Sequence, residues 1–451
     1  MIDTEPLRRL TEALLAAAAK AGAAEADAVA VRAAATSVDV RNGALEQAER
    51  ADGVEIGLRV LLNGRQACVS ASETSERTMA EMAERAVAMA REAPVDDSLG
   101  LAPPELLADG NEVAALELEE AAAAEPSPAE LQARAEAAEA AARAVPGVST
   151  AETASASFAR RASWVSASNG FSAGYRRTTH ALSVVAIAGE GTGMERDWAA
   201  EQRVWAADMP TPEEVGRLAG ERTAARIGAR RPPTGPVPIL YDRRVAGSLI
   251  GHLISAINGA AIARGSSWLR DAMGEAVLPP GLSLTDDPHR PRFAASRPFD
   301  AEGLATAPRA LVEDGVLRSW LLDLSTGRKL GLPSTANAAR GTASPPSPAP
   351  SNLTLTPGRE SPEALIAQMG RGLVVTSLLG ASVNPTTGDY YRGAAGFWVE
   401  GGRIAWPVNE CTIAGNLREM LMRMTPACDV PPWRGLAVPS LLVEGMTVAG
   451  A

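Results

Sequence analysis

Every second residue from Val54 to Val60 is apolar, and this strict alternation is the feature that most limits what the chain can form. Successive side chains of a β-strand point to opposite faces, so the pattern predicts a strand over 53–61 with one buried and one solvated face. Asn63-Gly64 follows, and Asn-Gly is a preferred pair for a two-residue hairpin turn. The chain is therefore predicted to return in an antiparallel strand over Gln66–Ala71.

The arrangement of strands, hairpin and helix is used twice in the first half of the chain. A second hairpin signal, Asn169-Gly170, lies among further strand-like residues, so we expect two similar units over 1–100 and 145–230. The other predicted strands cover 27–33, 37–41, 149–158, 162–167, 171–177, 180–188 and Trp198–Val204, and the predicted helices cover 4–24, 73–92, 128–144 and 211–229.

The second half of the chain is rich in strand signals that glycine and proline interrupt. Asp314-Gly315 and Gly401-Gly402 divide the strand-like runs 309–323 and 397–408, so each run predicts a hairpin, and closed or strongly bent sheets are expected. A Pro/Ser-rich loop at 341–351 suits either a flexible flap or a connector.

These patterns indicate an α+β fold with two domains. The Arg- and Pro-rich stretch Arg230–Gly235 is the best boundary candidate. We expect an N-terminal mixed α/β domain over 1–230, with twisted antiparallel-rich sheets and flanking helices. A β-rich C-terminal domain is expected over 236–451.

One apolar helix is predicted near the start of the second domain, over 243–267. Pro238–Asp242 has the composition of a short strand, and Asp242 can cap the helix that follows. One face of this helix is predicted to be core, because apolar residues recur at helical spacing: Val245, Leu249, Leu253, Ile254, Ile257 and Ala261.

The helix lacks the residues of a metal site. His252 has no second histidine four or five residues away and no acid beside it, so we expect a partly buried histidine with a local partner. The chain has three histidines and three cysteines, and they show no ligand spacing. We therefore expect no metal ligand and no catalytic residue in this chain. A site assembled from His180, His289 and Cys428 remains a separate hypothesis.

Charge and composition exclude several classes of partner. The 43 basic and 54 acidic residues give a net charge of −11 without a basic cluster, which argues against binding nucleic acid or an anionic membrane. No run of 18 apolar residues occurs, and the scattered cysteines fit a reducing compartment. We expect a cytoplasmic protein.

The helix and several later runs resemble one known protein family. GSLIGHLISAINGAAIARGSSWL at 247–269 resembles the PmbA branch, also called TldE, of the TldD/PmbA metalloprotease family, which is also known as the modulator of DNA gyrase family. The resemblance covers most of 235–451, through DGVLRSWLLDLSTGRKLG at 314–331, SNLTLTPG at 351–358, NPTTGDYYRGAAGFWVEGG at 384–402, PVNECTIAGNL at 407–417 and the closing LLVEGMTVAGA. It is weaker at 51–65 and 168–177.

The resemblance implies a role without a metal of its own. In the TldD branch the corresponding helix carries His-Glu-x-x-x-His, where two histidines hold zinc and the glutamate acts as general base. Counted back from Gly265, those positions fall on Ile250, Gly251 and Ser255, and none of these residues can take that role. The implied function is the non-catalytic subunit of a heterodimer whose TldD-type partner holds the zinc and hydrolyses unfolded or small peptides. The gyrase label does not imply contact with DNA. The alternative is a stand-alone homodimer that binds peptides without cutting them.

Four polar residues within the family-like runs are candidates for binding a peptide or the partner. They are Asn258 and Arg264 on the helix, and Glu410 and Asn416 near the C-terminus. Arg264 suits either a helix carboxyl end or a peptide carboxylate. Asn416 also suits a turn, and Glu410 also suits an ion pair with an arginine.

Overall fold

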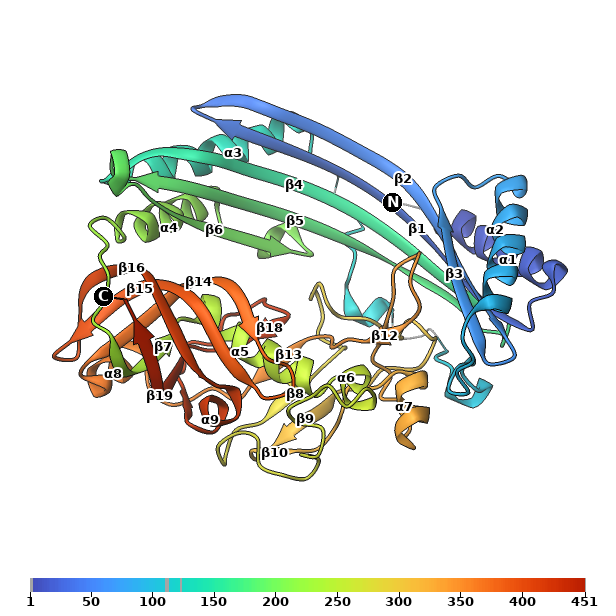
Figure 1. The fold of residues 1–451 in the computed structure, drawn as a ribbon. Coiled ribbons are helices and arrows are strands. Elements are labelled where there is room, and N and C mark those ends of the chain that lie inside the picture. Colours follow the sequence, from blue (N-terminus) through green and yellow to red (C-terminus); the bar gives the residue numbers. More distant parts are fainter. Residues whose placement is uncertain (1–2, 110–112, 122–123, 451) are drawn as a thin grey trace.

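The computed structural model describes residues 3–109, 113–121 and 124–450, and combines one long curved sheet with a β-rich second half (Figure 1). The expected α+β fold is confirmed. The elements of the first half are α1 (Glu5–Ala21), β1 (Glu25–Arg41), β2 (Ala44–Leu62), β3 (Arg65–Ala71), α2 (Glu76–Glu92), α3 (Pro128–Arg143), β4 (Val148–Ala167), β5 (Ser172–Ala188), β6 (Glu195–Arg203) and α4 (Pro212–Ala224).

The six strands of the first half form one antiparallel sheet in the order β3-β2-β1-β4-β5-β6. A helix, three strands and a helix occur in this order twice, from α1 to α2 and from α3 to α4. The second set begins at Pro128, ahead of the predicted unit over 145–230. The two sets share the sheet, because β1 and β4 pair at its centre from Asp27↔Ala167 to Val40↔Ala154. Figure 1 shows α1 and α2 at one end of the sheet and α3 and α4 at the other.

The strands are longer than the sequence predicts. The sequence predicts gaps between strands at 34–36, 159–161 and 178–179. In the structure these residues belong to continuous strands, because neighbouring strands pair with them. β2 begins at Ala44 rather than near residue 53, since its polar first half lacks alternation but pairs with β1. The hairpin between β1 and β2 turns at Asn42-Gly43, where both residues have positive φ values of 55° and 70°, as a type I′ turn requires. The predicted turn at Asn63-Gly64 is confirmed.

The four long helices cover one face of the sheet. Side chains at even positions of β4 point to this face, where Ala156 and Phe158 pack in a core with α3 and α4, and Ala162 packs in a core with α1 and α2. Odd positions point to the opposite face, which the second half of the chain meets, for example where Tyr175 of β5 packs edge-on against Phe299 with ring centroids 5.6 Å apart.

The second half is rich in strands, as predicted. Its elements are β7 (Gly235–Tyr241), α5 (Arg243–Ala256), α6 (Gly259–Ala263), β8 (Leu284–Asp286), β9 (Arg309–Glu313), β10 (Val316–Leu317), α7 (Leu324–Leu330), β11 (Ala338–Ala339), β12 (Ser347–Pro348), β13 (Leu353–Leu355), α8 (Pro362–Met369), β14 (Gly372–Val383), β15 (Asp389–Glu400), β16 (Arg403–Asn416), α9 (Leu417–Met422), β17 (Met424–Pro426), β18 (Leu436–Ala437) and β19 (Leu441–Ala449).

Two sheets organise this half. One follows the order β16-β15-β14-β7-β19-β17, and an additional pairing between β16 and β19 closes its first five strands into a ring. The other is a five-stranded sheet in the order β10-β9-β8-β13-β18. The predicted hairpins at Asp314-Gly315 and Gly401-Gly402 connect β9 to β10 and β15 to β16. The expectation of closed or bent sheets is confirmed.

The prediction of a single helix over 243–267 is wrong. The segment forms two helices, because α5 ends at Ala256 and Asn258 leaves the helical conformation with φ −70° and ψ 125°. The chain bends there because Gly259 N donates a hydrogen bond to the carbonyl oxygen of Leu321 at 2.8 Å instead of continuing the helix. Among the described residues, no helix is long and apolar enough to cross a membrane.

The Pro/Ser-rich loop at 341–351 is anchored to the long sheet at its start. Arg340, which precedes the loop, forms a buried ion pair with Asp27 of β1, and Asp27 also pairs with Arg59 of β2. The Thr342 hydroxyl donates to Glu55 at 2.5 Å. The backbone of Thr342 lies so close to Gly57 that a Cβ there would come within 2.1 Å of the Thr342 carbonyl oxygen. This contact favours the connector over the flexible flap.

Candidate functional site

Helix α5 runs through the core of the second half. β7 leads into it, and Asp242 caps it by accepting a hydrogen bond from Arg244 N at 2.8 Å. Leu249, Ile250 and Leu253 are fully buried in the largest apolar cluster of the chain. At its first turn, Arg244 forms an ion pair with Asp197 of β6 at 3.1 Å, so the start of α5 is joined to the edge of the long sheet.

The three positions that correspond to a zinc-binding helix cannot hold a metal. Ile250 is apolar and fully buried. Gly251 has no side chain, and a Cβ built there would meet no atom within 4 Å. The exposed Ser255 already donates its hydroxyl to the carbonyl oxygen of Gly251 at 2.9 Å. The residues present therefore do not fit a zinc ion, whose ligands are imidazole, thiolate and carboxylate groups.

His252 is partly buried, as predicted, and its ring meets Tyr390 edge-on with centroids 5.8 Å apart. Its Nε2 is buried and has no hydrogen-bond partner in the part of the chain that the structure describes, so the expected local partner is not found for this atom. Burial and then the charge of Arg392 lower the pKa of His252 below its usual value. The imidazole is therefore neutral at physiological pH.

The structure does not bring His180, His289 and Cys428 together as one site. His180 pairs with Glu120 on the helix-covered face of the long sheet, with Nε2 and Oε2 3.0 Å apart. His289 lies in a loop beside Thr306, and Cys428 is an exposed residue of another segment. Within the described ranges, no group of three His, Cys, Asp or Glu side chains is placed to hold a metal ion.

Asn258 and Arg264 lie at the two ends of α6. Asn258 accepts a hydrogen bond from Ala260 N at 3.0 Å and donates one to the carbonyl oxygen of Pro348 at 2.8 Å. It therefore caps the helix and fixes the neighbouring loop. Arg264 is exposed after the last turn of α6, and no ion pair with it occurs among the described residues.

Asn416 and Glu410 lie on β16, six residues apart, which separates them by about 20 Å along a strand. Asn416 caps α9, and its amide donates to the Thr387 carbonyl oxygen and to Asp389, both at 3.1 Å. Glu410 forms an exposed ion pair with Arg231 at 2.9 Å. The partners of both residues are structural, and Glu410 and Asn416 do not share one site.

A polar cavity of about 160 Å³, which the sequence did not indicate, lies where the long sheet meets α6 and α7. Burial, followed by the charge of Asp300, raises the pKa of Glu302 to about 8, so this carboxyl group is protonated at neutral pH. No local pattern could reveal the cavity, because separate segments supply its lining: Arg59, Gln66, Leu99, Ala260, Glu302, Asp323, Ser325, Thr326, Lys329 and Pro346 to Pro348.

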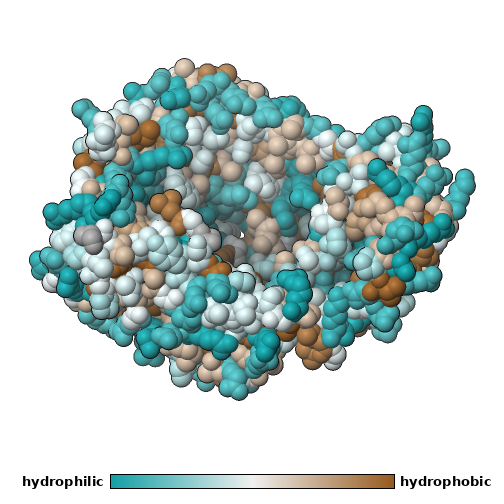
Figure 2. Space-filling model, in the orientation of Figure 1, coloured by the Kyte–Doolittle hydropathy of each residue, from teal (hydrophilic) through white to brown (hydrophobic). Residues whose placement is uncertain are grey.

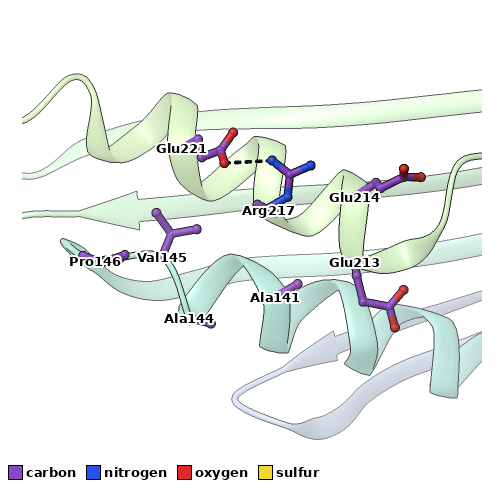
Figure 3. A pocket seen from close by; sticks show the side chains of 8 residues that line it. All are labelled: Ala141, Ala144, Val145, Pro146, Glu213, Glu214, Arg217 and Glu221. Carbon is purple, nitrogen blue, oxygen red and sulfur yellow. Dashed lines mark hydrogen bonds and ion pairs between the residues drawn. The ribbon is translucent and has the colours of Figure 1, made fainter.

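A wider groove of about 550 Å³ lies between α3 and α4 (Figure 3), and the residues that line it all belong to the first half of the chain. Its floor is formed by small apolar residues, and its charged residues lie on α4. Arg217 there pairs with Glu221 at 2.9 Å, one turn along the same helix. Such a pair is typical of a solvated helix face, so the groove shows no set of polar groups that would fix a ligand.

Family models and full-length relatives both identify the same protein family for this chain. Models of the PmbA/TldA metallopeptidase match it in three parts: domain 1 over residues 26–90, the central domain over 122–227 and the C-terminal domain over 234–450. The Metalloprotease PmbA of Escherichia coli O157:H7 is 36% identical, covering 99% of this chain and 98% of that protein. The Metalloprotease PmbA homolog of Haemophilus influenzae is 33% identical, covering 99% and 96%.

Solved structures show the same fold. The crystal structure of a proposed modulator of DNA gyrase from Bacteroides thetaiotaomicron is similar with a TM-score of 0.91 and 25% identity, covering 100% of both chains. TldE from Thermococcus kodakarensis has a TM-score of 0.85 at 20% identity, covering 97% of this chain and 99% of that one. Together, the three domain models and the full-length relatives show that the chain belongs to the PmbA/TldD metallopeptidase family.

Proposed function

We propose that this chain is the non-catalytic subunit of a heterodimeric metallopeptidase, whose TldD-type partner holds the zinc and cleaves unfolded or small peptides. The observation that carries the proposal is the chemistry of α5. Its three key positions hold Ile250, Gly251 and Ser255, so a member of a metallopeptidase family has no metal ligand where one would be needed. A partner with the His-Glu-x-x-x-His helix would supply the missing groups.

A partner of this class is also supported by sequence. The Metalloprotease TldD homolog of Haemophilus influenzae is 24% identical to this chain over half of each protein. Two related chains can pair through similar surfaces and still differ in which one carries the metal. We propose that the pair works in the cytoplasm, because the cysteines of the described residues are unpaired and fit a reducing compartment.

The chain can contribute to peptide cleavage without a metal. Figure 2 shows a hollow near the centre of the molecule, between the long sheet and the second half. The outer edge of β2 is open from Ala44 to Glu55, since β3 pairs with β2 only from Ile56 onward. An extended peptide adds main-chain hydrogen bonds to such an edge, and the hollow would limit entry to unfolded segments.

The test is to measure zinc content and hydrolysis of an unfolded protein such as casein for this chain alone, for a TldD-type subunit alone, and for the two mixed. About one zinc per pair, and hydrolysis that depends on both subunits, are expected. The variants Ser255→Ala and His252→Gln should leave the activity of the mixture unchanged, because neither side chain touches the reaction. Zinc-dependent hydrolysis by this chain alone would refute the proposal.

If the mixture is inactive but this chain binds peptides as a homodimer, the chain is a stand-alone binding protein. Sedimentation of the purified chain with and without a peptide distinguishes that outcome.

A further inference from the structure

An unusual charge arrangement lies on the face of the long sheet that the helices leave uncovered. Arg161 of β4 and Arg177 of β5 are directly opposite each other in the antiparallel register, so their Cβ atoms are about 5 Å apart on one face. Like charges in directly opposed positions destabilise a sheet. Arg177 is also close enough to Arg297 of the second half for the two charges to repel.

Carboxylates compensate these three charges only in part. The charge of Asp300 lies close enough to Arg297 to attract it, but among the described residues none of the three arginines forms an ion pair with a carboxylate. Arg177 donates to the carbonyl oxygen of Ser296 at 2.5 Å, and Arg297 donates to those of Ala338 and Ala349 at 3.3 and 2.8 Å. The Nε atoms of Arg177 and Arg297 are buried and have no partner in the described ranges. Carbonyl oxygens satisfy donors but do not neutralise the charge.

Arg161 lies where the uncovered face of the sheet carries small side chains. Odd positions of β4 and β5, and the residues of β1 paired with them, share the face that carries Arg161. Arg161 is exposed, and its neighbours on this face are small and not fully buried: Ala33, Ala35, Ser157, Ala159, Thr179 and Ala181. The second half of the chain meets this face next to them, where Tyr175 packs on Phe299. The charge of Arg161 is therefore accessible and lies beside a part of the sheet with small side chains.

We infer that Arg161 and Arg177, with Arg297 beside them, form a binding site for a carboxylate of the peptide substrate. Guanidinium groups bind carboxylates through paired, charge-assisted hydrogen bonds, and a carboxylate here would remove the repulsion between the arginines. The carboxylate is either the C-terminal group of a peptide or an acidic side chain. The inference deepens the proposed function and rests on it, because it assigns to the non-catalytic subunit the selection of acidic or C-terminal segments.

The test uses the purified full-length chain and four N-acetylated hexapeptides made of glycine, alanine and serine. One has a free C-terminal carboxylate, one has a C-terminal amide, and two amidated peptides carry an internal glutamate or glutamine. Binding is measured by isothermal titration calorimetry. Tighter binding of the free acid than of the amide would assign the site to peptide C-termini. Tighter binding of the glutamate peptide than of the glutamine peptide would assign it to acidic side chains.

Arg161→Gln should weaken the preferred peptide about tenfold, as expected for the loss of a charge-assisted contact. Arg161→Lys should keep part of the preference. The matched control is Arg196→Gln, since Arg196 lies on β6 and pairs with Glu152 at 2.6 Å. The control should bind as the wild type does.

A stability measurement separates a ligand site from a structural role. Without a carboxylate ligand, Arg161→Gln should melt no lower than the wild type, because it removes one of two opposed like charges. Equal binding of all four peptides, or a preference that Arg161→Gln leaves intact, would overturn the inference. These outcomes are independent of zinc and of hydrolysis. The site can therefore fail while the mixture remains an active peptidase, and the proposed function can fail while carboxylate binding is found.

Discussion

Replacement of Asp27 by asparagine should be among the most damaging single changes in the long sheet. Asp27 lies between Arg59 and Arg340, and the exposed fraction of each of the three side chains is 4% or less. The change leaves two buried guanidinium groups without a counter-charge, and breaking a buried ion pair in this way typically costs about 3–5 kcal/mol. We expect a loss of about 4 kcal/mol, which is a large part of the stability of an ordinary domain.

The assay is urea denaturation followed by circular dichroism, with Asp52→Asn as the matched control. Asp52 pairs with Arg32 at 3.1 Å, but both side chains are at least 40% exposed, so its removal should cost less than about 1 kcal/mol. The double variant Asp27→Asn with Arg340→Met should recover part of the loss, because one unpaired buried cation is gone. Losses for Asp27→Asn and the control that agree within about 1 kcal/mol would refute this reasoning.

The pH dependence gives a second measurement of the same cluster. Burial pushes the pKa of Asp27 upward, but the charges of Arg340 and Arg59 outweigh it and hold this pKa below its usual value. The pair therefore stabilises the folded state above the pKa of the unfolded chain, and this contribution is lost as the pH falls through the lower folded pKa. The free energy of unfolding of Asp27→Asn should therefore fall less steeply at low pH than that of the wild type.

Three further changes test other parts of the structure. Gly57→Ala should cost about 1–3 kcal/mol in urea denaturation, because the added Cβ would lie 2.1 Å from the carbonyl oxygen of Thr342; an unchanged midpoint would contradict this close contact. Burial raises the pKa of Glu302 from 4.5 to about 8, so the wild type loses stability as the pH rises between these two values. Near pH 8.5, Glu302→Gln should be more stable than the wild type by roughly 1–3 kcal/mol. Burial and then the charge of Arg392 lower the pKa of His252, so the unfolded chain binds a proton before the folded chain does as the pH falls below 6.5. The melting temperature of His252→Leu should therefore fall less steeply below this pH than that of the wild type. Curves of melting temperature against pH that run parallel for the two proteins would count against this prediction.

Local patterns predicted the elements of the chain better than their lengths. Alternation and Asn-Gly pairs located the hairpins at Asn63-Gly64 and Asn169-Gly170, because both signals arise within a few residues. The turn at Asn42-Gly43 was not predicted. These signals failed at Ala44–Gly53 of β2, whose polar residues are held in a strand only by pairing with β1. They failed again at Asn258, where a hydrogen bond from Gly259 to Leu321 ends one helix and starts another. Contacts between distant segments decide such cases.

Some properties of the candidate site could likewise be predicted from the sequence, and others required the structure. That Ile250, Gly251 and Ser255 are not typical zinc ligands follows from residue types alone, so it could be stated from the sequence. The roles of Asn258 and Asn416 as helix caps required the structure, since a cap depends on where the helix starts. The opposed pair Arg161 and Arg177 could not be predicted, because the register of β4 and β5 is fixed along two long strands.

The central pairing of β1 with β4 has a consequence for how the chain is made. During synthesis, α1, β1, β2, β3 and α2 emerge well before β4, so one long edge of β1 has no partner while the ribosome adds the intervening residues. An unpaired edge of this length can join a strand of another nascent chain, and contacts between distant segments form slowly. Assembly of this sheet is therefore the step at which we expect protection by a chaperone to matter most.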